Sequence, residues 1–206
     1  MKQKTVYLCS DCGYESPKWF GKCPSCGAWN TMSEYKVKPE SAARGTSDFQ
    51  RGTSRPTLLR EIELGDESRF HSGMGELDRV LGGGAVHGSF VLVGGEPGIG
   101  KSTLLLQMCQ EMCKAARVLY VSGEESLRQI KLRAARLQIS SPDLYILAET
   151  DMEQILAETE LLAPDILIVD SIQTVYKHDL TAAPGGATQI KECAMSLMQY
   201  AKNRNV

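Results

Sequence analysis

The residues best suited to chemistry lie in a glycine-rich stretch near the middle of the chain. Residues 95–102 read GEPGIGKS and match the pattern G-x-x-x-x-G-K-[ST] at every position. Glycines let a backbone curl until its N–H groups point inward, and such a turn can cradle phosphate oxygens. We therefore predict a nucleotide-binding loop made of Gly95, Glu96, Pro97, Gly98, Ile99, Gly100, Lys101, Ser102 and Thr103.

The context of this loop agrees with the motif. The apolar run 89–94 (SFVLVG) predicts a strand before the loop, and residues 101–116 predict a helix after it. The N-terminus of that helix would add partial positive charge for a phosphate. Lys101 is expected to reach the β- and γ-phosphates of ATP and to act in catalysis, while Ser102 is expected to ligate Mg²⁺.

Two acidic positions at strand ends are candidates to complete this site. Glu124 follows the apolar run 117–123, and Asp170 ends the apolar run 165–170. In open α/β sheets, ligands bind at the carboxyl ends of the strands. A carboxylate after four apolar residues costs desolvation energy unless it meets a cation, so Asp170 is predicted to hold Mg²⁺ through water. Glu124 is the candidate general base, and Glu125 is the alternative.

Four cysteines near the N-terminus have the spacing of a metal site. Cys9 and Cys12 form one C-x2-C pair and Cys23 and Cys26 form another, with ten residues between the pairs. Two such pairs suit tetrahedral Zn²⁺, which would supply the folding energy that so short a segment lacks. A rubredoxin-like iron site is the alternative. A redox C-x-x-C pair would not occur twice in thirty residues.

Basic and aromatic residues alternate within the same segment. Lys18, Trp19, Phe20 and Lys22 lie between the cysteine pairs, and Trp29 follows them. Such residues can grip phosphates and stack on bases, which makes Lys18 and Lys22 candidate DNA contacts. The alternative is that the aromatic rings cover the small core around the metal.

Beyond the cysteines, the chain divides into a linker and an α/β domain. Residues 36–57 carry Pro, Gly, Ser, Thr and Arg without an apolar period, which is typical of a flexible linker. From residue 58 onward, apolar strands alternate with amphipathic helices and predict a mostly parallel sheet covered by helices. The expected division is thus a zinc finger at 1–35, a linker at 36–57 and a core at 58–206.

Later strands are expected at residues 144–147 and 165–170. Helices are expected near 76–81, 126–139, 151–163 and 188–203, and the last of them follows a loop over residues 171–187.

Charge and composition restrict the setting of the protein. Residues 1–60 hold 10 Lys and Arg against 5 Asp and Glu, whereas residues 61–206 hold 13 against 20. A basic N-terminal segment followed by an acidic remainder suggests that the basic segment contacts a polyanion. No apolar run approaches the roughly 18 residues of a membrane span, and the N-terminus lacks a signal-peptide core, so we expect a cytoplasmic protein. Its seven cysteines are then expected to be ligands or buried thiols rather than disulfides.

With these residues placed, the sequence resembles the bacterial RadA (Sms) family of DNA repair ATPases in the RecA superfamily. The resemblance rests on CSDCGYESPKWFGKCPSCGAWNT, SGMGELDRVLGGGAVHGSFVLVGGEPGIGKST, YVSGEES, and ILIVDSIQT followed by APGG. It implies a RecA-like core, a DNA-dependent ATPase that binds single-stranded and branched DNA in recombination, a recombinase as a possible partner, and a homo-oligomeric ring. It also implies that Glu124 is the catalytic glutamate and that Lys177, in the loop after Asp170, contacts DNA.

The resemblance also suggests that the chain is the N-terminal part of a longer protein, because family members continue beyond the position of KNRNV. Two other classes of function stay open. One is a KaiC-like regulatory ATPase that acts on proteins and shares the pattern SGxxxLD…GG…GKST. The other is a zinc-dependent adaptor whose nucleotide site switches without hydrolysis.

Overall fold

The computed structural model describes residues 4–37, 56–61 and 69–206, and its N-terminal part is a small antiparallel ribbon. Strand β1 (Lys4–Cys9) lies between β2 (Glu15–Ser16) and β3 (Met32–Val37). Its pairing with β3 places Cys9 opposite Met32. Strand β3 continues two residues into the predicted linker, and most of that linker, residues 38–55, lies outside the described residues.

The core is built on three parallel strands in the order β7-β6-β8. Strand β6 (Val118–Ser122) pairs with β7 (Leu144–Ala148) on one side and with β8 (Ile166–Asp170) on the other. All five residues of β6 are buried, as expected for a central strand with helices on both faces. The three strands lie within two residues of their predicted positions, so the predicted parallel α/β architecture is confirmed.

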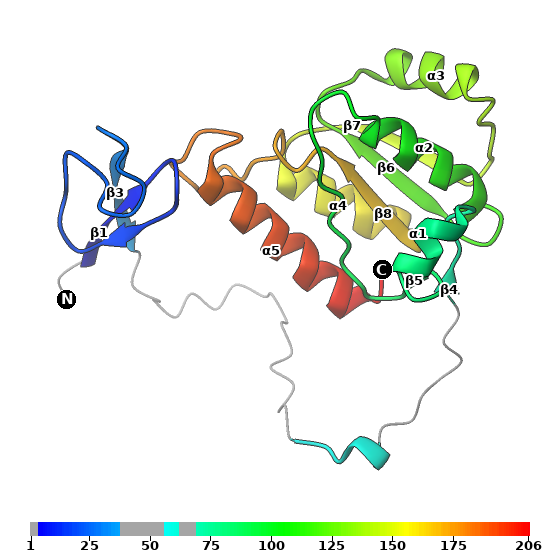
Figure 1. The fold of residues 1–206 in the computed structure, drawn as a ribbon, viewed down its shortest axis with the longest axis horizontal. Coiled ribbons are helices and arrows are strands. Elements are labelled where there is room, and N and C mark those ends of the chain that lie inside the picture. Colours follow the sequence, from blue (N-terminus) through cyan, green and yellow to red (C-terminus); the bar gives the residue numbers. More distant parts are fainter. Residues whose placement is uncertain (1–3, 38–55, 62–68) are drawn as a thin grey trace.

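Helices cover both faces of this sheet (Figure 1). Helices α2 (Lys101–Met112) and α3 (Leu127–Arg136) pack on one face, in a cluster that includes Leu106, Tyr120 and Ile130. Helices α4 (Met152–Leu162) and α5 (Ala187–Arg204) pack on the other face, in a cluster that includes Ile155 and Leu197. The alternation of side chains along β6 supplies both clusters, because successive residues point to opposite faces.

A short unit precedes the phosphate loop. It holds the 3-10 turn Leu59–Glu61, the helix α1 (Gly75–Val80), and the hairpin of β4 (Arg69–Phe70) with β5 (Ala85–Val86). The loop between α1 and β5 contains Gly84, whose φ is 124°. A Cβ at that position would lie 2.7 Å from the carbonyl oxygen of Phe70, so only glycine lets the two strands of the hairpin meet.

The strand predicted over residues 89–94 is absent, and this prediction was wrong. The stretch is irregular, and Phe90, Val91 and Leu92 expose 41%, 48% and 75% of their surface. Figure 1 draws it as a long irregular trace that connects β5 to α2. An extended segment becomes a strand only when a neighbour satisfies its N–H and C=O groups. Among the described residues, β8 pairs with β6 alone, and no strand pairs with residues 89–94.

None of the helices described for this chain combines the length and the apolar character that crossing a membrane requires.

Candidate nucleotide and metal sites

The glycine loop forms although the strand before it does not. Gly98 and Gly100 have φ angles of 80° and 103°, which residues with side chains rarely adopt. Gly100 caps the N-terminus of α2, and its carbonyl accepts the first hydrogen bond of the helix, from Leu104. The backbone therefore turns sharply just before a helix of twelve residues, whose first N–H groups have no partner within the helix.

Lys101 folds back over the loop that precedes it. Its ammonium nitrogen donates to the carbonyl oxygens of Gly95 at 2.9 Å and Glu96 at 3.0 Å. The cation thus lies inside the turn, close to the N-terminus of α2. An anion that entered the loop would find a positive charge and free N–H groups there, which is the arrangement that favours phosphate.

Asp170 lies at the end of β8, half-buried and hydrogen-bonded. Its Oδ2 accepts a hydrogen bond of 2.5 Å from the hydroxyl of Tyr120 on β6. In the pairing of the two strands, Asp170 lies opposite Ser122, which is two residues beyond Tyr120 on the same face. That face is the one covered by α2, so Asp170 and the helix that follows the phosphate loop share one side of the sheet.

The two glutamates after β6 have different partners. Glu124 is exposed, and its Oε1 accepts a hydrogen bond of 2.9 Å from the hydroxyl of Ser171, the residue after Asp170. Glu125 forms an ion pair with Arg133 of α3. The structure therefore brings Glu124 to the junction that follows β8, and it holds Glu125 against the neighbouring helix.

A polar hollow of about 280 Å³ opens at the carboxyl ends of β6 and β7. Glu124, Glu125 and Glu149 line it, together with Ser122, Gly123, Ser126, Ala148 and Thr150. No residue of the phosphate loop lines it. Glu149 also accepts hydrogen bonds from the backbone N–H groups of Thr150 and Asp151, at the start of α4.

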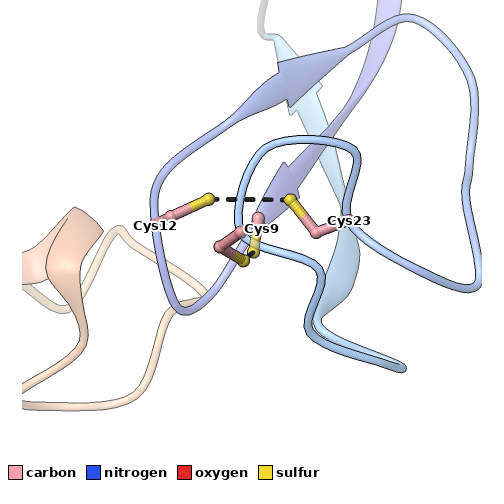
Figure 2. A group of neighbouring side chains, drawn as sticks. Cys9, Cys12 and Cys23 are labelled. Atoms are coloured by element: carbon pink, nitrogen blue, oxygen red, sulfur yellow. Dashed lines mark hydrogen bonds between the residues drawn. The ribbon is translucent and has the colours of Figure 1, made fainter.

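The four cysteines of the ribbon converge as predicted. Their sulfur atoms all lie within 4.8 Å of one another, and they are the one such group of possible metal ligands among the described residues. Cys9 and Cys26 approach to 3.7 Å and Cys12 and Cys23 to 3.6 Å. Figure 2 shows Cys12 and Cys23 facing each other from two separate loops. A tetrahedral ion with bonds of about 2.3 Å would separate its sulfur ligands by roughly 3.8 Å, so the group fits Zn²⁺ or iron.

The two cysteine loops have the same backbone geometry. Gly13 donates its N–H to the carbonyl of Cys9, and Gly27 donates its N–H to the carbonyl of Cys23. Gly13 and Gly27 have φ angles of 73° and 76°, and this allows the chain to turn around the metal position.

The thiols of this group do not ionise together easily. Burial raises the pKa of Cys9, but hydrogen bonds from Thr31 and the backbone outweigh it and lower the pKa to about 6. A backbone hydrogen bond from Ala28 lowers the pKa of Cys26, but desolvation and the neighbouring thiols raise it to about 12. Four thiolates at this spacing therefore require a cation to balance their charge.

The remaining cysteines are buried thiols. Burial raises the pKa of Cys109 to about 12 and that of Cys193 to about 11, and it also raises the pKa of Cys113. These groups are protonated at neutral pH, as expected for cysteines that serve as small apolar residues.

Three aromatic residues of the ribbon keep a large part of their surface exposed. Trp19 exposes 55% of its surface, Phe20 40% and Trp29 70%. The buried residues around the metal position are instead Cys9, Cys23 and Met32. Lys22 places its ammonium 5.5 Å from the centre of the Trp29 ring, and Lys18 is exposed. The ribbon thus presents a basic and aromatic surface.

Lys177, the other candidate DNA contact, points along the core rather than away from it. Its ammonium donates to the hydroxyl of Ser196 on α5 at 3.4 Å. The side chain of Gln189, which is 1% exposed, holds the backbone of the loop: it accepts from the N–H of Lys177 and donates to the carbonyls of Lys177 and Ala182. The loop also lies against the ribbon, since Leu180 and Leu8 line a shared small hollow.

Sequence reasoning missed Tyr120 and Arg133. The signal for Tyr120 was a tyrosine within the buried strand sequence VLYVS, because a buried tyrosine hydroxyl usually finds a partner. No signal identified Arg133 as the partner of Glu125, since eight residues separate them across a helix start.

Two family models match separate parts of the chain. A model described as a rubredoxin metal binding domain matches residues 7–34, and one described as an AAA domain matches residues 60–200. The second match covers more than half of the 206 residues. The chain therefore belongs to the AAA-domain family, and a four-cysteine metal-binding segment precedes that domain.

Curated relatives make the relationship more specific. The chain is 50% identical over 208 residues to DNA repair protein RadA of Bacillus subtilis (strain 168) and 48% identical over 206 residues to that of Listeria monocytogenes serovar 1/2a. Each alignment covers 100% of this chain and the N-terminal 45% of the relative. The predicted resemblance to the N-terminal part of RadA is thus confirmed, and the chain spans about half the length of these relatives.

A solved structure agrees on the fold. The DnaB-like replicative helicase, determined with its interactions with primase, matches 71% of this chain and 44% of its own with a TM-score of 0.55 and 19% identity. At that identity the match supports the RecA-like arrangement of sheet and helices alone.

Proposed function

We propose that this chain is the nucleotide-binding part of a DNA repair ATPase. The observation that carries the proposal is Lys101, whose ammonium is folded into a glycine loop at the N-terminus of α2. The relatives named DNA repair protein RadA support the biological setting. The ATPase activity is part of this proposal, since the chain aligns with 45% of the length of these relatives.

The proposed roles follow from position and charge. ATP displaces the two carbonyls from Lys101, which then contacts the β- and γ-phosphates, while the N–H groups of residues 95–103 surround them. Ser102 at the start of α2 and Asp170 at the end of β8 would hold Mg²⁺, Asp170 through water, and the ion would supply positive charge to the phosphates. These residues fit the ion because hydroxyl and carboxylate oxygens are the ligands that Mg²⁺ prefers.

Glu124 is the proposed general base. A water molecule attacks the γ-phosphorus, its proton passes to the carboxylate of Glu124, and the bond from the γ-phosphorus to the bridging oxygen of ADP breaks. Glu125 is less suited because the charge of Arg133 neutralises it. The hydrogen bond from Ser171 orients Glu124 toward the end of β8, where Asp170 lies.

The four-cysteine ribbon is proposed to bind Zn²⁺ and to take part in DNA binding with Lys18 and Lys22. Exposed Trp19 and Trp29 offer flat surfaces for bases beside these cations. Single-stranded DNA is the proposed ligand, and Lys177 in the loop after β8 is a further proposed contact. Assembly into a homo-oligomeric ring is proposed for the longer protein.

The decisive experiment is phosphate release with and without single-stranded DNA. It is run on this chain and on a full-length RadA relative, because hydrolysis can require parts that this chain does not contain. Release stimulated by DNA supports the proposal. Phosphate release at the same rate with and without DNA favours a protein-directed ATPase. Tight ATP binding without phosphate release in either protein favours a nucleotide switch.

A further inference from the structure

The hydrogen bond between Tyr120 and Asp170 has no role in the proposed function so far. Tyr120 is 1% exposed and ranks among the fully buried side chains. Its hydroxyl donates to Oδ2 of Asp170 at 2.5 Å. A phenylalanine would fill nearly the same volume in the apolar cluster of β6 without a hydroxyl to satisfy. The hydroxyl therefore needs an explanation beyond packing.

The surroundings fix where this hydroxyl lies. Tyr120 pairs with Ile168 on β8, and Asp170 is two residues further along the same face. The ring packs in the cluster that contains Leu106 and Cys109 of α2, the helix that begins at Lys101 and Ser102. The position of the phenol is thus set by the same helix that carries the phosphate loop.

In this hydrogen bond the Tyr120 hydroxyl is the donor and Oδ2 of Asp170 is the acceptor. A phenol that donates to Oδ2 uses one lone pair of that oxygen and restricts the rotation of the carboxylate. Oδ1 is then the freer of the two oxygens for a cation or for the water around it.

We infer that Tyr120 is a positioning residue for the magnesium site. It holds the carboxylate of Asp170 in one rotation, with Oδ1 turned to the cation, and it ties that orientation to the packing of α2. The inference rests on the proposed function, because it takes Asp170 to be the acidic residue that faces Mg²⁺.

The test is the binding of Mn²⁺ in place of Mg²⁺, measured by electron paramagnetic resonance on this chain with ADP present. Tyr120→Phe is expected to weaken Mn²⁺ binding roughly 10- to 100-fold, as losses of partners behind a metal ligand do. Binding of ADP without metal is expected to stay unchanged, since the phosphate loop is intact. Tyr145→Phe on β7 is the matched control, because Tyr145 is exposed and pairs with Leu119 rather than lying beside Asp170.

The variant Asp170→Asn distinguishes a failure of the proposed magnesium site from a failure of the role inferred for Tyr120. If Asp170→Asn leaves Mn²⁺ binding unchanged, the proposed magnesium site is wrong. If Asp170→Asn weakens it and Tyr120→Phe does not, the site stands and the role of Tyr120 is refuted. In the double variant, Tyr120→Phe is expected to add nothing to Asp170→Asn, because its effect passes through that carboxylate.

A second measurement avoids a change of packing. Fluorotyrosine placed at position 120 keeps the ring and the hydroxyl, and its fluorine signal reports the surroundings of the phenol. Addition of Mg²⁺ to the ADP-bound chain is expected to shift the signal with the midpoint of metal binding. A signal that does not respond while metal binds would overturn the inference.

Discussion

Replacement of Gly123 by alanine tests whether the junctions after β6 and β8 are packed as closely as the structure has them. A Cβ on Gly123 would lie 2.0 Å from Oγ1 of Thr174 and 3.0 Å from Cγ2 of Thr150. The Thr174 hydroxyl donates to the carbonyl of Ser171 at 2.8 Å, and the N–H of Gly123 donates to the carbonyl of Asp170. The added methyl group must therefore displace Thr174 and break its bond.

The expected loss combines these two effects. Overpacking of a tight site costs typically 1–3 kcal/mol, and one hydrogen bond contributes about 1 kcal/mol. A loss of about 3 kcal/mol in the free energy of unfolding would lower the melting temperature of a domain this size by roughly 10 °C. Gly75→Ala is the matched control, because a Cβ there meets nothing within 4 Å.

Calorimetric melting of the two variants provides the assay. Thr174→Ala should partly restore Gly123→Ala, since it removes the nearest atom, so the double variant should lose less than the sum of the single changes. Hydrolysis should fall further than ATP binding in Gly123→Ala, because Thr174 supports Ser171 and Ser171 holds Glu124. Equal melting temperatures for Gly123→Ala and Gly75→Ala would refute the close approach.

Four other outcomes follow from the proposed sites. Lys101→Ala should abolish tight binding in a fluorescent-ATP titration, and unchanged affinity would contradict the role of its cation. Glu124→Gln should bind ATP but hydrolyse it at least 100-fold more slowly in single-turnover assays; an inactive Glu125→Gln beside an active Glu124→Gln would reverse the assignment. Chelation should release one Zn²⁺ by elemental analysis and unfold the ribbon while the core transition persists. Single-stranded DNA binding followed by anisotropy should weaken with salt, and Lys177→Ala should reduce the log–log slope by roughly 0.7 only with an ATP analogue present.

Local patterns were sufficient to predict most elements that position the sites. Strands β6, β7 and β8 were predicted because short apolar runs end at turns, and the cysteine and glycine motifs carry their own geometry. The absence of a strand over residues 89–94 could not be predicted. An apolar run indicates that a segment is able to pair in a sheet, but it does not indicate whether a neighbouring strand lies beside it. The exposure of Trp19 and Trp29 was not predicted either, because so short a ribbon buries few residues for the rings to cover.

Contacts that depend on the register between strands could not be predicted from the sequence. Tyr120 meets Asp170 only because β6 and β8 align so that Ser122 lies opposite Asp170. The same holds for Glu124 and Ser171, which come from different strand ends and meet 47 residues apart in the chain. One residue of slippage in this pairing would turn the partner to the other face of the sheet.

The loop after β8 connects regions that the sequence presents as separate. It begins at Ser171, which holds Glu124, and its backbone is fixed in the middle by Gln189. Farther on, it lies against the ribbon at Leu180. Val175, between Ser171 and the part held by Gln189, is fully buried, so this part of the loop has little freedom to move independently. A shift of Ser171 that accompanied a change at Glu124 would therefore reach Lys177 through packed and hydrogen-bonded backbone. This is the physical basis for expecting that the proposed DNA contact of Lys177 depends on nucleotide.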